Sequence, residues 1–417
     1  MTSTGIQREA LPENWRVVRL KDACVQMKQG QILPMPDVKE VGAYPVYGAN
    51  GQVGYTDTYF LDDPRVLITC RGSTCGVINM APAKSFVTNN SMILFEKDFV
   101  DREYLFFALQ EYSTANLRNG SGQPQLTQGI LYDHEIPIPS RDEQQRIARV
   151  LSTVQEAIAQ QERLIRTTTE LKQALMQKLF TEGLRGEKQK ETEVGMVPES
   201  WEVVRLGSLA DVISKGSSPN WQGFEYQEHG VLFVRSQNVG NGQMDLTDKV
   251  YLDQAFNQKE KRSVLKKSDI LLNLVGASIG RVALAVDEVE GANCNQAVCF
   301  VRISQGEALR LFLVNFLLSP AGQEQIRQQK KDIARANLSL LDVRNFLVPI
   351  PANDSDTEQI AEAFTTVETK LSQHKGKRDA LQDLFRTLLH ELMTGKVRVG
   401  DLDPGPTFAK SYGTTKS

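Results

Sequence analysis

One long helical pattern occurs twice in this sequence, over residues 141–182 and again over about residues 354–395. In both stretches apolar residues recur alternately three and four positions apart, which is the heptad pattern of a helix that packs against another helix. So narrow an apolar stripe does not stabilise an isolated helix in water, so each copy needs a partner, and the other copy is the simplest one. Two unrelated surface helices are the alternative. The predicted seam is Ile147, Leu151, Val154, Ile158, Ile165, Leu175 and Leu179 in the first copy and Ile360, Phe364, Val367, Leu371, Leu381, Phe385, Leu388 and Leu392 in the second.

The remainder of the chain repeats as well, with matched segments in the same order in each half. The matches are "LPENWRVVRL" (11–20) with "VPESWEVVRL" (197–206), "RGSTCG" (71–76) with "VGASIG" (275–280), "TNNSMILF" (88–95) with "NCNQAVCF" (293–300), "QLT" (125–127) with "NLS" (337–339), and "IPIP" (136–139) with "VPIP" (348–351). This order indicates a tandem duplication of a globular unit followed by a long helix. Because proline disfavours helix at the residue before it, each long helix begins only beyond its proline pair.

Each repeat predicts a mixed α+β globule. Short apolar runs bounded by turn residues predict strands at 66–69, 91–95, 231–234 and 269–275, and amphipathic helices follow at about 102–117 and 308–328. Trp15 and Trp201 open the two units among apolar neighbours, which favours core packing over base stacking. The predicted organisation is a first globular domain (1–140), a first long helix (141–182), a polar linker (183–195), a second globular domain (196–352), a second long helix (353–396) and a disordered tail (397–417).

The length of the linker constrains how the helices pair. A helix of about 40 residues spans roughly 60 Å, whereas a linker of about 14 residues reaches at most roughly 48 Å when fully extended. A parallel pair would require the second globule to begin back beside the first. We therefore predict an antiparallel two-helix coiled coil that separates two similar α+β globules related by a pseudo-twofold axis.

Composition excludes several classes of protein. The formal net charge is −3, and no apolar run is long enough for a transmembrane helix. The start of the chain lacks the apolar segment of a secretory signal. The five cysteines form no C-x-x-C pair and no histidine lies near them, which favours buried, reduced cysteines over zinc ligands and a cytoplasmic protein.

No catalytic constellation is evident in the sequence. It lacks the G-x-x-x-x-G-K-[ST] phosphate loop and the N-P-P-aromatic or D-P-P-aromatic tetrapeptide that amino-methyltransferases use on a flipped base. Its four histidines, His134, His229, His374 and His390, have no nucleophile partner at motif spacing. We therefore expect a non-catalytic chain that itself binds no metal or cofactor.

Two similar but non-identical heads at a fixed separation suit a bipartite target on double-stranded DNA, because two-headed DNA binders read separated half-sites. The P-E-x-W-x-V-x-R-L opening of each half, the G-x-x-x-G turns, the P-I-P segments and the long helices resemble the specificity (S) subunits of type I restriction–modification systems. The resemblance covers about residues 11–396. Without a strongly basic charge, phosphate-binding residues would have to be clustered locally or supplied by partner subunits.

The resemblance implies two target-recognition domains and assembly with two methyltransferase (M) and two restriction (R) subunits. It places S-adenosylmethionine, ATP and Mg²⁺ on those partners, where adenine N6 is methylated and DNA is cleaved. One departure from a strict repeat is Val275 in the second half, at the position of Arg71 in the first. A role of Arg71 in DNA binding is therefore not shared between the halves.

Candidate DNA contacts are amide, hydroxyl and cationic side chains in the expected loops, because such groups bind base edges and phosphates. In the first unit they are Lys28, Gln29, Gln31, Asn50, Gln52, Arg71, Ser73, Asn89, Asn90, Arg118, Gln123 and Gln125. In the second they are Lys215, Ser217, Arg235, Gln237, Asn238, Arg281, Asn295, Gln296, Arg335 and Asn337. Candidate phosphate contacts are Lys259, Lys261, Arg262, Lys266, Lys267, Lys330 and Lys331. Each could instead be a turn-forming or solvated residue.

Charged residues on the outer faces of the long helices are candidates for docking M subunits, or are simply solvated. They are Arg146, Glu156, Arg163, Glu358, Glu362 and Glu368. The alternative function is a two-headed coiled-coil adaptor that binds two protein ligands and has no DNA specificity. Salt dependence separates these functions, because DNA binding weakens steeply with added salt and apolar protein docking does not.

Overall fold

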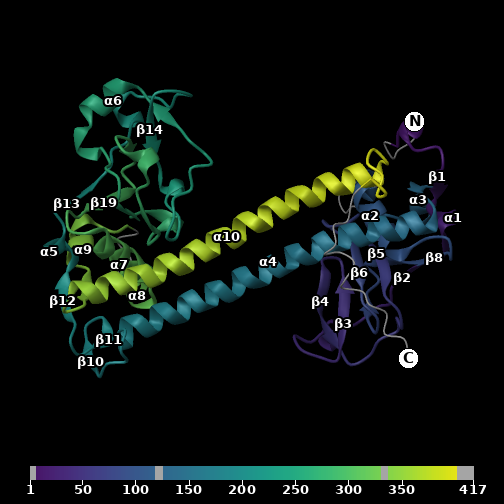
Figure 1. The fold of residues 1–417 in the computed structure, drawn as a ribbon, viewed down its shortest axis with the longest axis horizontal. Helices are drawn as coiled ribbons and strands as arrows, with labels where there is room; N and C mark the ends of the chain where they lie inside the picture. Colours follow the sequence, from purple (N-terminus) through teal and green to yellow (C-terminus); the bar gives the residue numbers. More distant parts are fainter. Residues whose placement is uncertain (1–5, 118–124, 330–336, 402–417) are drawn as a thin grey trace. The chain divides into compact units, whose positions relative to one another are not determined.

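The computed structural model describes residues 6–117, 125–329 and 337–401 (Figure 1). It divides into two compact units, of residues 1–162 with 376–417 and of residues 163–375. Each unit therefore consists of one globule together with half of each long helix. The long helices are α4 (Arg141–Glu182) and α10 (Asp354–Met393).

The first unit contains two small sheets and a separate strand pair. The larger sheet has the order β2-β8-β5-β6, and every neighbouring pair in it is antiparallel. The smaller sheet has the order β4-β3-β7, in which β3 and β7 run parallel. Strand β1 pairs with β9, which carries the first proline segment. The strands are β1 (Arg16–Arg19), β2 (Cys24–Gln29), β3 (Tyr44–Gly48), β4 (Gly51–Thr56), β5 (Arg65–Thr69), β6 (Ile78–Ala81), β7 (Phe86–Val87), β8 (Ser91–Glu96) and β9 (Glu135–Ile138), and the short helices are α1 (Leu20–Ala23), α2 (Arg102–Glu111) and α3 (Gln128–Tyr132).

The second unit repeats this topology strand for strand. Its sheets have the orders β13-β19-β16-β17 and β15-β14-β18, with β14 and β18 parallel, and β12 pairs with β20. The strands are β12 (Glu202–Arg205), β13 (Val212–Lys215), β14 (Val231–Val234), β15 (Tyr251–Leu252), β16 (Ile270–Asn273), β17 (Val282–Leu284), β18 (Asn293–Cys294), β19 (Val298–Arg302) and β20 (Leu347–Ile350). The short helices are α5 (Leu206–Leu209), α6 (Gln254–Lys259), α7 (Glu307–Leu318), α8 (Pro320–Gln329) and α9 (Leu340–Asn345). The predicted α+β tandem repeat is confirmed.

The central strands carry consecutive apolar residues because both of their faces are buried. In β5, Val66 and Ile68 belong to the main core of the first unit, which also holds Trp15 and residues of α2, α4 and α10. The intervening Leu67 faces a second, smaller core with Ile93. Side chains alternate between the two faces of a strand, so one continuous apolar run serves both cores. In β16 of the second unit, Leu271 and its two neighbours alternate in the same way.

Within each unit, the start of one long helix packs with the end of the other. Ile147 and Leu151 of α4 share the first core with Leu392 near the end of α10. In the second unit, Phe180 near the end of α4 stacks on Phe364 near the start of α10, with ring centroids 5.7 Å apart. This order is that of an antiparallel pair, as predicted. Every residue of the predicted seam is buried or half-buried.

The same ion pair occurs at the helix ends of both units. Arg398, just beyond α10, binds Glu143 in the first turn of α4, with 2.8 Å between Nε and Oε1. Arg185, just beyond α4, binds Asp356 in the first turn of α10, with 3.1 Å between Nη2 and Oδ1. In both pairs the carboxylate belongs to a buried residue. Both the arginines and the carboxylates are 213 positions apart in the sequence (398 − 185 and 356 − 143), so the duplication extends to this contact.

The structure corrects two expectations for the segments after the sheets. Residues 308–328 form two helices, because Ser319 is extended before Pro320 and proline disfavours helix at the preceding residue. Residues 102–117 form α2 and a separate 3₁₀ turn over Thr114–Leu117.

Two further corrections concern the predicted linker and tail. The linker holds β10 (Gln189–Thr192), which forms a hairpin with β11 (Gly195–Pro198) at the start of the predicted second domain. Gly195 has a φ of 98°, which favours glycine. The start of the tail is ordered, because Val397 and Val399 pack against the first core. Residues 402–417 of the predicted tail lie outside the described residues.

Candidate nucleic-acid interface

Strand ends and turns that are distant in the sequence meet along one edge of the first unit. Backbone hydrogen bonds join them, from Gly30 N to Ser91 O (3.0 Å), Gln31 N to Val87 O (2.9 Å), Cys70 N to Asn90 O (2.8 Å) and Leu126 N to Cys70 O (3.0 Å). We call this region the first polar edge, because eight of the predicted contact residues lie on it. They are Gln29, Gln31, Asn50, Arg71, Ser73, Asn89, Asn90 and Gln125.

The second unit has an equivalent second polar edge. The matching backbone bonds run from Gly216 N to Val298 O (3.1 Å), Ser217 N to Cys294 O (3.1 Å), Leu274 N to Ala297 O (2.8 Å) and Leu338 N to Leu274 O (3.0 Å). Isolated bridges join Arg71 to Gln125 in one unit and Val275 to Asn337 in the other. The residues gathered on the second polar edge are Lys215, Ser217, Arg235, Gln237, Arg281, Asn295, Gln296 and Asn337.

The register of the strands shifts one of the sequence matches by two positions. Thr69 pairs with Ser91, and the equivalent Asn273 pairs with Val298. Ser91 therefore corresponds to Val298, whereas the alignment of "TNNSMILF" with "NCNQAVCF" placed it opposite Gln296. The two turns before β8 and β19 are alike in polar composition, so the sequence alone does not fix which residues are equivalent.

A glycine at the end of an edge strand allows each polar edge to close. A Cβ on Gly30 would lie 2.3 Å from Thr88 O, and one on Gly216 would lie 1.8 Å from Cys294 O. Both distances are shorter than any real Cβ contact, so only glycine fits these two positions. The side chains on either side, Gln29 and Gln31 in the first unit, are thereby held at the junction of the two sheets.

Hydrogen bonds organise the side chains of the first polar edge. Thr74 Oγ1 donates to Ala49 O at 2.7 Å and lies 3.0 Å from Asn50 Oδ1. Gln29 Nε2 donates to Asn89 O at 2.5 Å. The exposed predicted contacts that remain are Gln31, Asn50, Ser73 and Gln125. Lys28 and Gln52 lie beside this edge, since the Lys28 ammonium lies 6.0 Å from the centre of the Phe60 ring and Gln52 is on β4.

The second polar edge carries more internal charge pairing. Arg235 binds Asp248 at 3.0 Å, and Gln237 Nε2 donates to the same carboxylate at 2.5 Å. Ser217 Oγ donates to Glu260 Oε2 at 2.7 Å. These acids reduce the positive charge that the edge presents, which agrees with the near-neutral composition. Lys215, Gln296, Asn337 and Arg281 are exposed.

Asn238 differs from the other candidates because it organises its own loop. Its side chain accepts a hydrogen bond from Arg235 N at 2.9 Å and donates to the carbonyls of Asp245 and Asp248. The residue is only 3% exposed. With its amide used in this way, Asn238 is not available to a base, and we remove it from the set of candidate contacts.

The predicted basic run over residues 259–267 does not form one continuous track. The Lys259 ammonium lies 5.6 Å from the centre of the Phe224 ring, and the following turn, Lys261–Ser263, lies against β13 and β18 near the second polar edge. Lys266 and Lys267 instead precede β16, at the opposite end of that strand from Asn273, and Lys267 binds Asp287 at 2.9 Å. Arg118, Gln123, Lys330, Lys331 and Arg335 lie outside the described residues.

Two features of the edges were not anticipated from the sequence. Thr74 is one, although its place in a G-S-T turn is a signal for a side chain that bonds to nearby backbone. The other is a pair of loops that leave the polar edges, residues 32–38 and 218–226, which we call the first and second proline loops. Each contains a 3₁₀ turn preceded by a proline, Pro34 or Pro219. Apolar residues among prolines were the available signal in the first loop, whereas the second loop has a single proline and no comparable signal.

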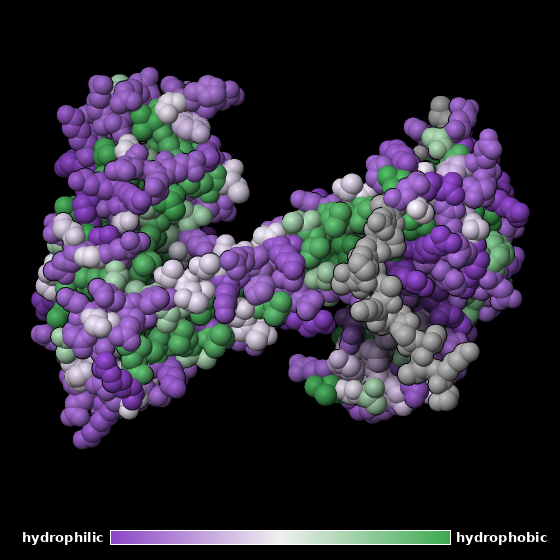
Figure 2. Space-filling view, viewed as in Figure 1, coloured by the Kyte–Doolittle hydropathy of each residue, from purple (hydrophilic) through white to green (hydrophobic). Residues whose placement is uncertain are grey.

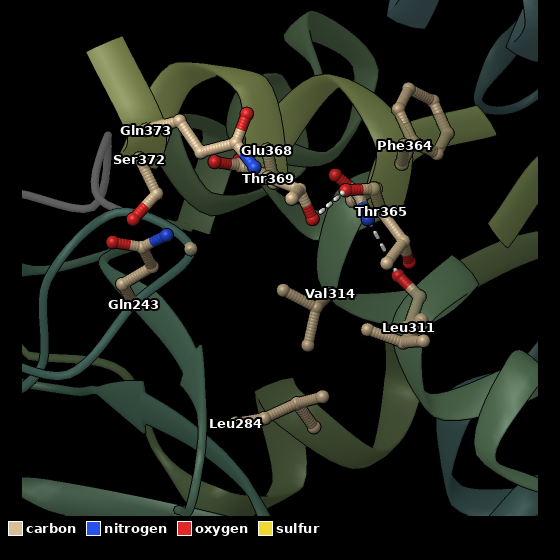
Figure 3. Close-up of a pocket in the computed structure, with 12 residues that line it drawn as sticks. Gln243, Leu284, Leu311, Val314, Phe364, Thr365, Glu368, Thr369, Ser372 and Gln373 are labelled. Carbon is tan, nitrogen blue, oxygen red and sulfur yellow. Dashed lines mark hydrogen bonds between the residues drawn. The ribbon is translucent and has the colours of Figure 1, made fainter. Parts of the chain in front are cut away.

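One cavity of about 390 Å³ in the second unit lies between α7, α10 and the loop that holds Gln243 (Figure 3). Threonines, glutamines and aliphatic side chains line it, together with Glu368. No group of three or more histidine, cysteine or acidic residues able to hold a metal occurs in the part of the chain that the structure describes.

The cysteines are buried, as the sequence analysis predicted. All five cysteines are free and buried, and burial raises the pKa of Cys24 and of Cys299 to about 12, which keeps these thiols protonated. Among the described helices, none is both long and apolar enough to cross a membrane.

Comparison with known proteins identifies the fold and the family. Residues 12–167 and 198–383 match the family model of the type I restriction modification DNA specificity domain. The type I restriction enzyme MjaVIII specificity subunit of Methanocaldococcus jannaschii is 26% identical over 410 residues, which are 94% of this chain and 95% of that protein. The EcoBI specificity subunit of Escherichia coli is 25% identical over 321 residues, covering 72% of this chain and 67% of that protein.

A solved structure shows the same fold. The S subunit of a type I restriction–modification system from M. genitalium superposes with a TM-score of 0.67 at 19% identity, covering 94% of this chain and 99% of that one. The family model covers each repeat from its opening segment into its long helix, which are the elements that build the two units. The chain therefore belongs to the type I restriction–modification DNA specificity family and is a specificity subunit of such a system.

Proposed function

We propose that the two polar edges bind the two halves of one bipartite, double-stranded DNA target. The observation that carries this proposal is the recurrence of one polar edge, built by the same strands and the same backbone hydrogen bonds, in both units. Amide and guanidinium groups at such an edge are suited to base edges in the major groove. Lys215 and the cations of residues 259–262 are suited to the neighbouring phosphates.

The target should be asymmetric, because equivalent positions of the two edges carry different side chains. Asn50 corresponds to Gln237, since each follows a carbonyl that accepts a side-chain hydrogen bond from the end of the central strand. Arg71 corresponds to Val275. An arginine can donate two hydrogen bonds to guanine, whereas a valine offers only an apolar contact. The two edges therefore present different chemistry to DNA.

Under this proposal the chain selects sequence, and other subunits carry out the chemistry in the cytoplasm. Two M subunits would bind S-adenosylmethionine and methylate adenine N6, and two R subunits would use ATP and Mg²⁺. Candidate docking residues on the helices that remain exposed are Glu156, Arg163, Glu358 and Glu362. Two others are already paired within the chain, Arg146 with Asp142 and Glu368 with Lys172.

Variants at equivalent positions test the assignment of one edge to each half-site. In complex with M subunits, Asn50→Ala should relax base selectivity in one half of the target and Gln237→Ala in the other. Each lost bidentate contact should weaken discrimination by about 1–3 kcal/mol. Modified adenines mapped at base resolution give the readout, and Gln189→Ala, an exposed amide on the β10–β11 hairpin, is the control.

The salt dependence of binding tests the adaptor alternative. DNA affinity of the complex should fall steeply and linearly on a logarithmic salt axis, because bound cations displace counterions from the phosphates. Complexes with Asn50→Ala or Gln237→Ala should keep the wild-type slope of affinity against salt, because these amides contact bases and not phosphates. An affinity for DNA that is flat with salt would favour apolar protein docking over the proposed function.

A further inference from the structure

The most exposed large hydrophobic side chains lie beside the polar edges. Among the described residues, Trp221 (90% exposed), Val41 (83%), Met35 (81%) and Ile32 (77%) have the highest exposed fractions of their kind. All four lie on the two proline loops or within three residues of one. Isolated hydrophobic residues are common on protein surfaces, and the surface here is largely hydrophilic (Figure 2). The presence of such a side chain on both proline loops, at equivalent places in the two units, requires an explanation.

The two proline loops occupy the same place in the fold. Each leaves the polar edge directly after Gln31 or Ser217, at the close contact made by Gly30 or Gly216. Each returns to the smaller sheet through an antiparallel bridge, Lys39 to Tyr55 in the first unit and Gln227 to Tyr251 in the second. The two segments differ in length and in sequence, yet both present a large apolar side chain from a 3₁₀ turn.

The second proline loop is held in a fixed shape below its exposed tip. Pro219 accepts backbone hydrogen bonds from Gln222 (2.9 Å) and Phe224 (3.1 Å). The Phe224 ring packs edge-on against Phe256, with centroids 5.3 Å apart, in a small apolar core. Phe224 therefore anchors the loop, while Trp221 projects outward from the turn between these contacts. A side chain held in this way loses little conformational freedom when it binds a ligand.

We propose that Trp221 and Met35 are wedge residues that insert at a base step of the DNA beside each half-site. This inference rests on the proposed function, because it assumes that the polar edges face DNA. Apolar side chains inserted between base pairs partly unstack them and kink the duplex, which allows more protein surface to contact the DNA. The indole of Trp221 stacks on a base, and the flexible thioether of Met35 fills the opened step.

The surroundings of Trp221 favour DNA over a protein ligand. Lys259, which lies over the Phe224 ring, and the exposed Lys261 and Arg262 place cations near the base of the second proline loop. Next to Trp221, Asn220 is polar and exposed. A stable protein interface needs a contiguous apolar centre, whereas a base step accepts one apolar side chain between polar contacts.

Fluorescence of 2-aminopurine in the target DNA tests the inference. The probe replaces bases one at a time in and beside each half-site. Its emission rises where stacking on the neighbouring base is lost and falls where an indole stacks on the probe itself, so a change of either sign marks the opened step. In the complex with M subunits, the wild-type chain should give one such position beside each half-site, apart from the methylated adenines. Trp221→Ala should abolish the signal beside the half-site of the second unit only, and Met35→Ala the other.

Conservative and distant variants make the test specific. Trp221→Phe should keep most of the signal because it keeps a stacking ring. Trp221→Ala should weaken DNA binding about 5- to 150-fold. Met196→Ala removes another exposed apolar side chain of the second unit, 44% exposed on β11, and should change neither quantity.

Three outcomes would overturn the inference. One is an unchanged probe signal in Trp221→Ala and Met35→Ala, and another is an equal loss of signal beside both half-sites in either variant. The third is a loss of M-subunit binding by Trp221→Ala or Met35→Ala in gel filtration, which would assign the loops to a protein partner. The probe signal and gel filtration do not measure base selectivity. Asn50→Ala and Gln237→Ala, which do, therefore test the proposed function separately.

Discussion

Arg185 and Arg398 show at the scale of single residues how each unit ties its two helix halves together. Arg185 lies three residues beyond the last residue of α4, and Arg398 lies five residues beyond the last residue of α10. Each reaches a carboxylate in the first turn of the other helix. Carboxylates in the first turn also interact favourably with the positive end of the helix dipole. Removing the arginine leaves a buried carboxylate with one fewer partner, which costs more than the loss of an exposed pair.

Arg185→Met should therefore destabilise the second unit, and Arg398→Met the first. Because both arginines are partly exposed, we expect about 1–3 kcal/mol in each case, below the cost of breaking a fully buried pair. Thermal and urea unfolding of the full chain give the measurement. Lys188→Met, at an exposed position of the segment after α4, is the control. An effect of Arg185→Met no larger than that of the control would contradict the role of the pair.

His134 predicts a pH dependence for the first unit. Burial lowers the pKa of His134 below its ordinary value of 6.5, although the hydrogen bond from Nε2 to Tyr112 O and the charge of Glu135 oppose the shift. The unfolded chain then binds a proton that the folded chain does not, so stability is present above pH 6.5 and falls as the pH drops below that value. His134→Gln should flatten this part of the stability profile measured by urea unfolding. A profile unchanged by the substitution would contradict the assignment.

At the scale of elements, the two units differ in the connection that follows the middle strand of the smaller sheet. In the first unit a tight turn joins β3 at Gly48 to β4 at Gly51. In the second, a loop over residues 235–250 joins β14 to β15, and Gly242 at its tip donates a hydrogen bond to Val282 O at 2.7 Å. A Cβ on Gly242 would lie 3.4 Å from Glu368 Oε1, beside the ion pair of Glu368 with Lys172.

This loop therefore connects the second polar edge to the long helices. It begins with Arg235 and Gln237 on that edge, and its tip at Gly242 lies beside α10. Gly242 has a φ of 92°, a conformation that β-branched residues rarely adopt. Gly242→Val should displace the tip and reduce base discrimination in the half-site of the second unit by about tenfold, which corresponds to about 1.4 kcal/mol. The first half-site should be unaffected.

Asn241→Ala, at an exposed position of the same tip, is the matched control for Gly242→Val. A second test exchanges the charges of the ion pair. Lys172→Glu or Glu368→Lys alone should lower base discrimination in the half-site of the second unit, and the two together should restore it. Methylation rates of oligonucleotides with one mismatch in either half give the readout. Equal losses in both halves would show that Gly242 acts on general stability rather than on the position of this loop.

The sequence was sufficient to predict the elements whose signals are local or repeated. The heptad spacing predicted the long helices and their seam, and the repeated segments predicted two α+β units. Trp15 and Trp201 lie in the cores, as their apolar neighbours indicated. These features follow from periodicity and burial, which a single sequence records directly.

The polar edges could be predicted only in part, because they depend on tertiary contacts. Gln31 and Asn50 were recognised by residue type, but the backbone bonds that bring them together join segments far apart in the chain. Asn238 has the same residue type as Asn50 and a different role, which only its buried hydrogen bonds reveal. Trp221 was missed because nothing in its neighbours indicates that it lies outside the core.

At the scale of the whole molecule, the proposed function makes the helix pair the element that sets the spacing of the two half-sites. Deleting one heptad from each helix at facing positions keeps the seam in register and shortens the pair by about 10 Å. Since base pairs are about 3.4 Å apart, the unread spacer of the target should shorten by about three base pairs. Mapping modified adenines would show the change, and an unaltered spacer would contradict the ruler role.

The central claim, that each unit reads its own half of one target, is tested most directly by a chimera. Residues 197–350 are replaced by the equivalent unit of a relative with a different target, and the chimera is expressed with its M subunits. Modified adenines are then mapped at base resolution. The account predicts that one half of the recognised sequence changes to that of the relative while the other half stays the same. Two unchanged halves, or two changed halves, would contradict it.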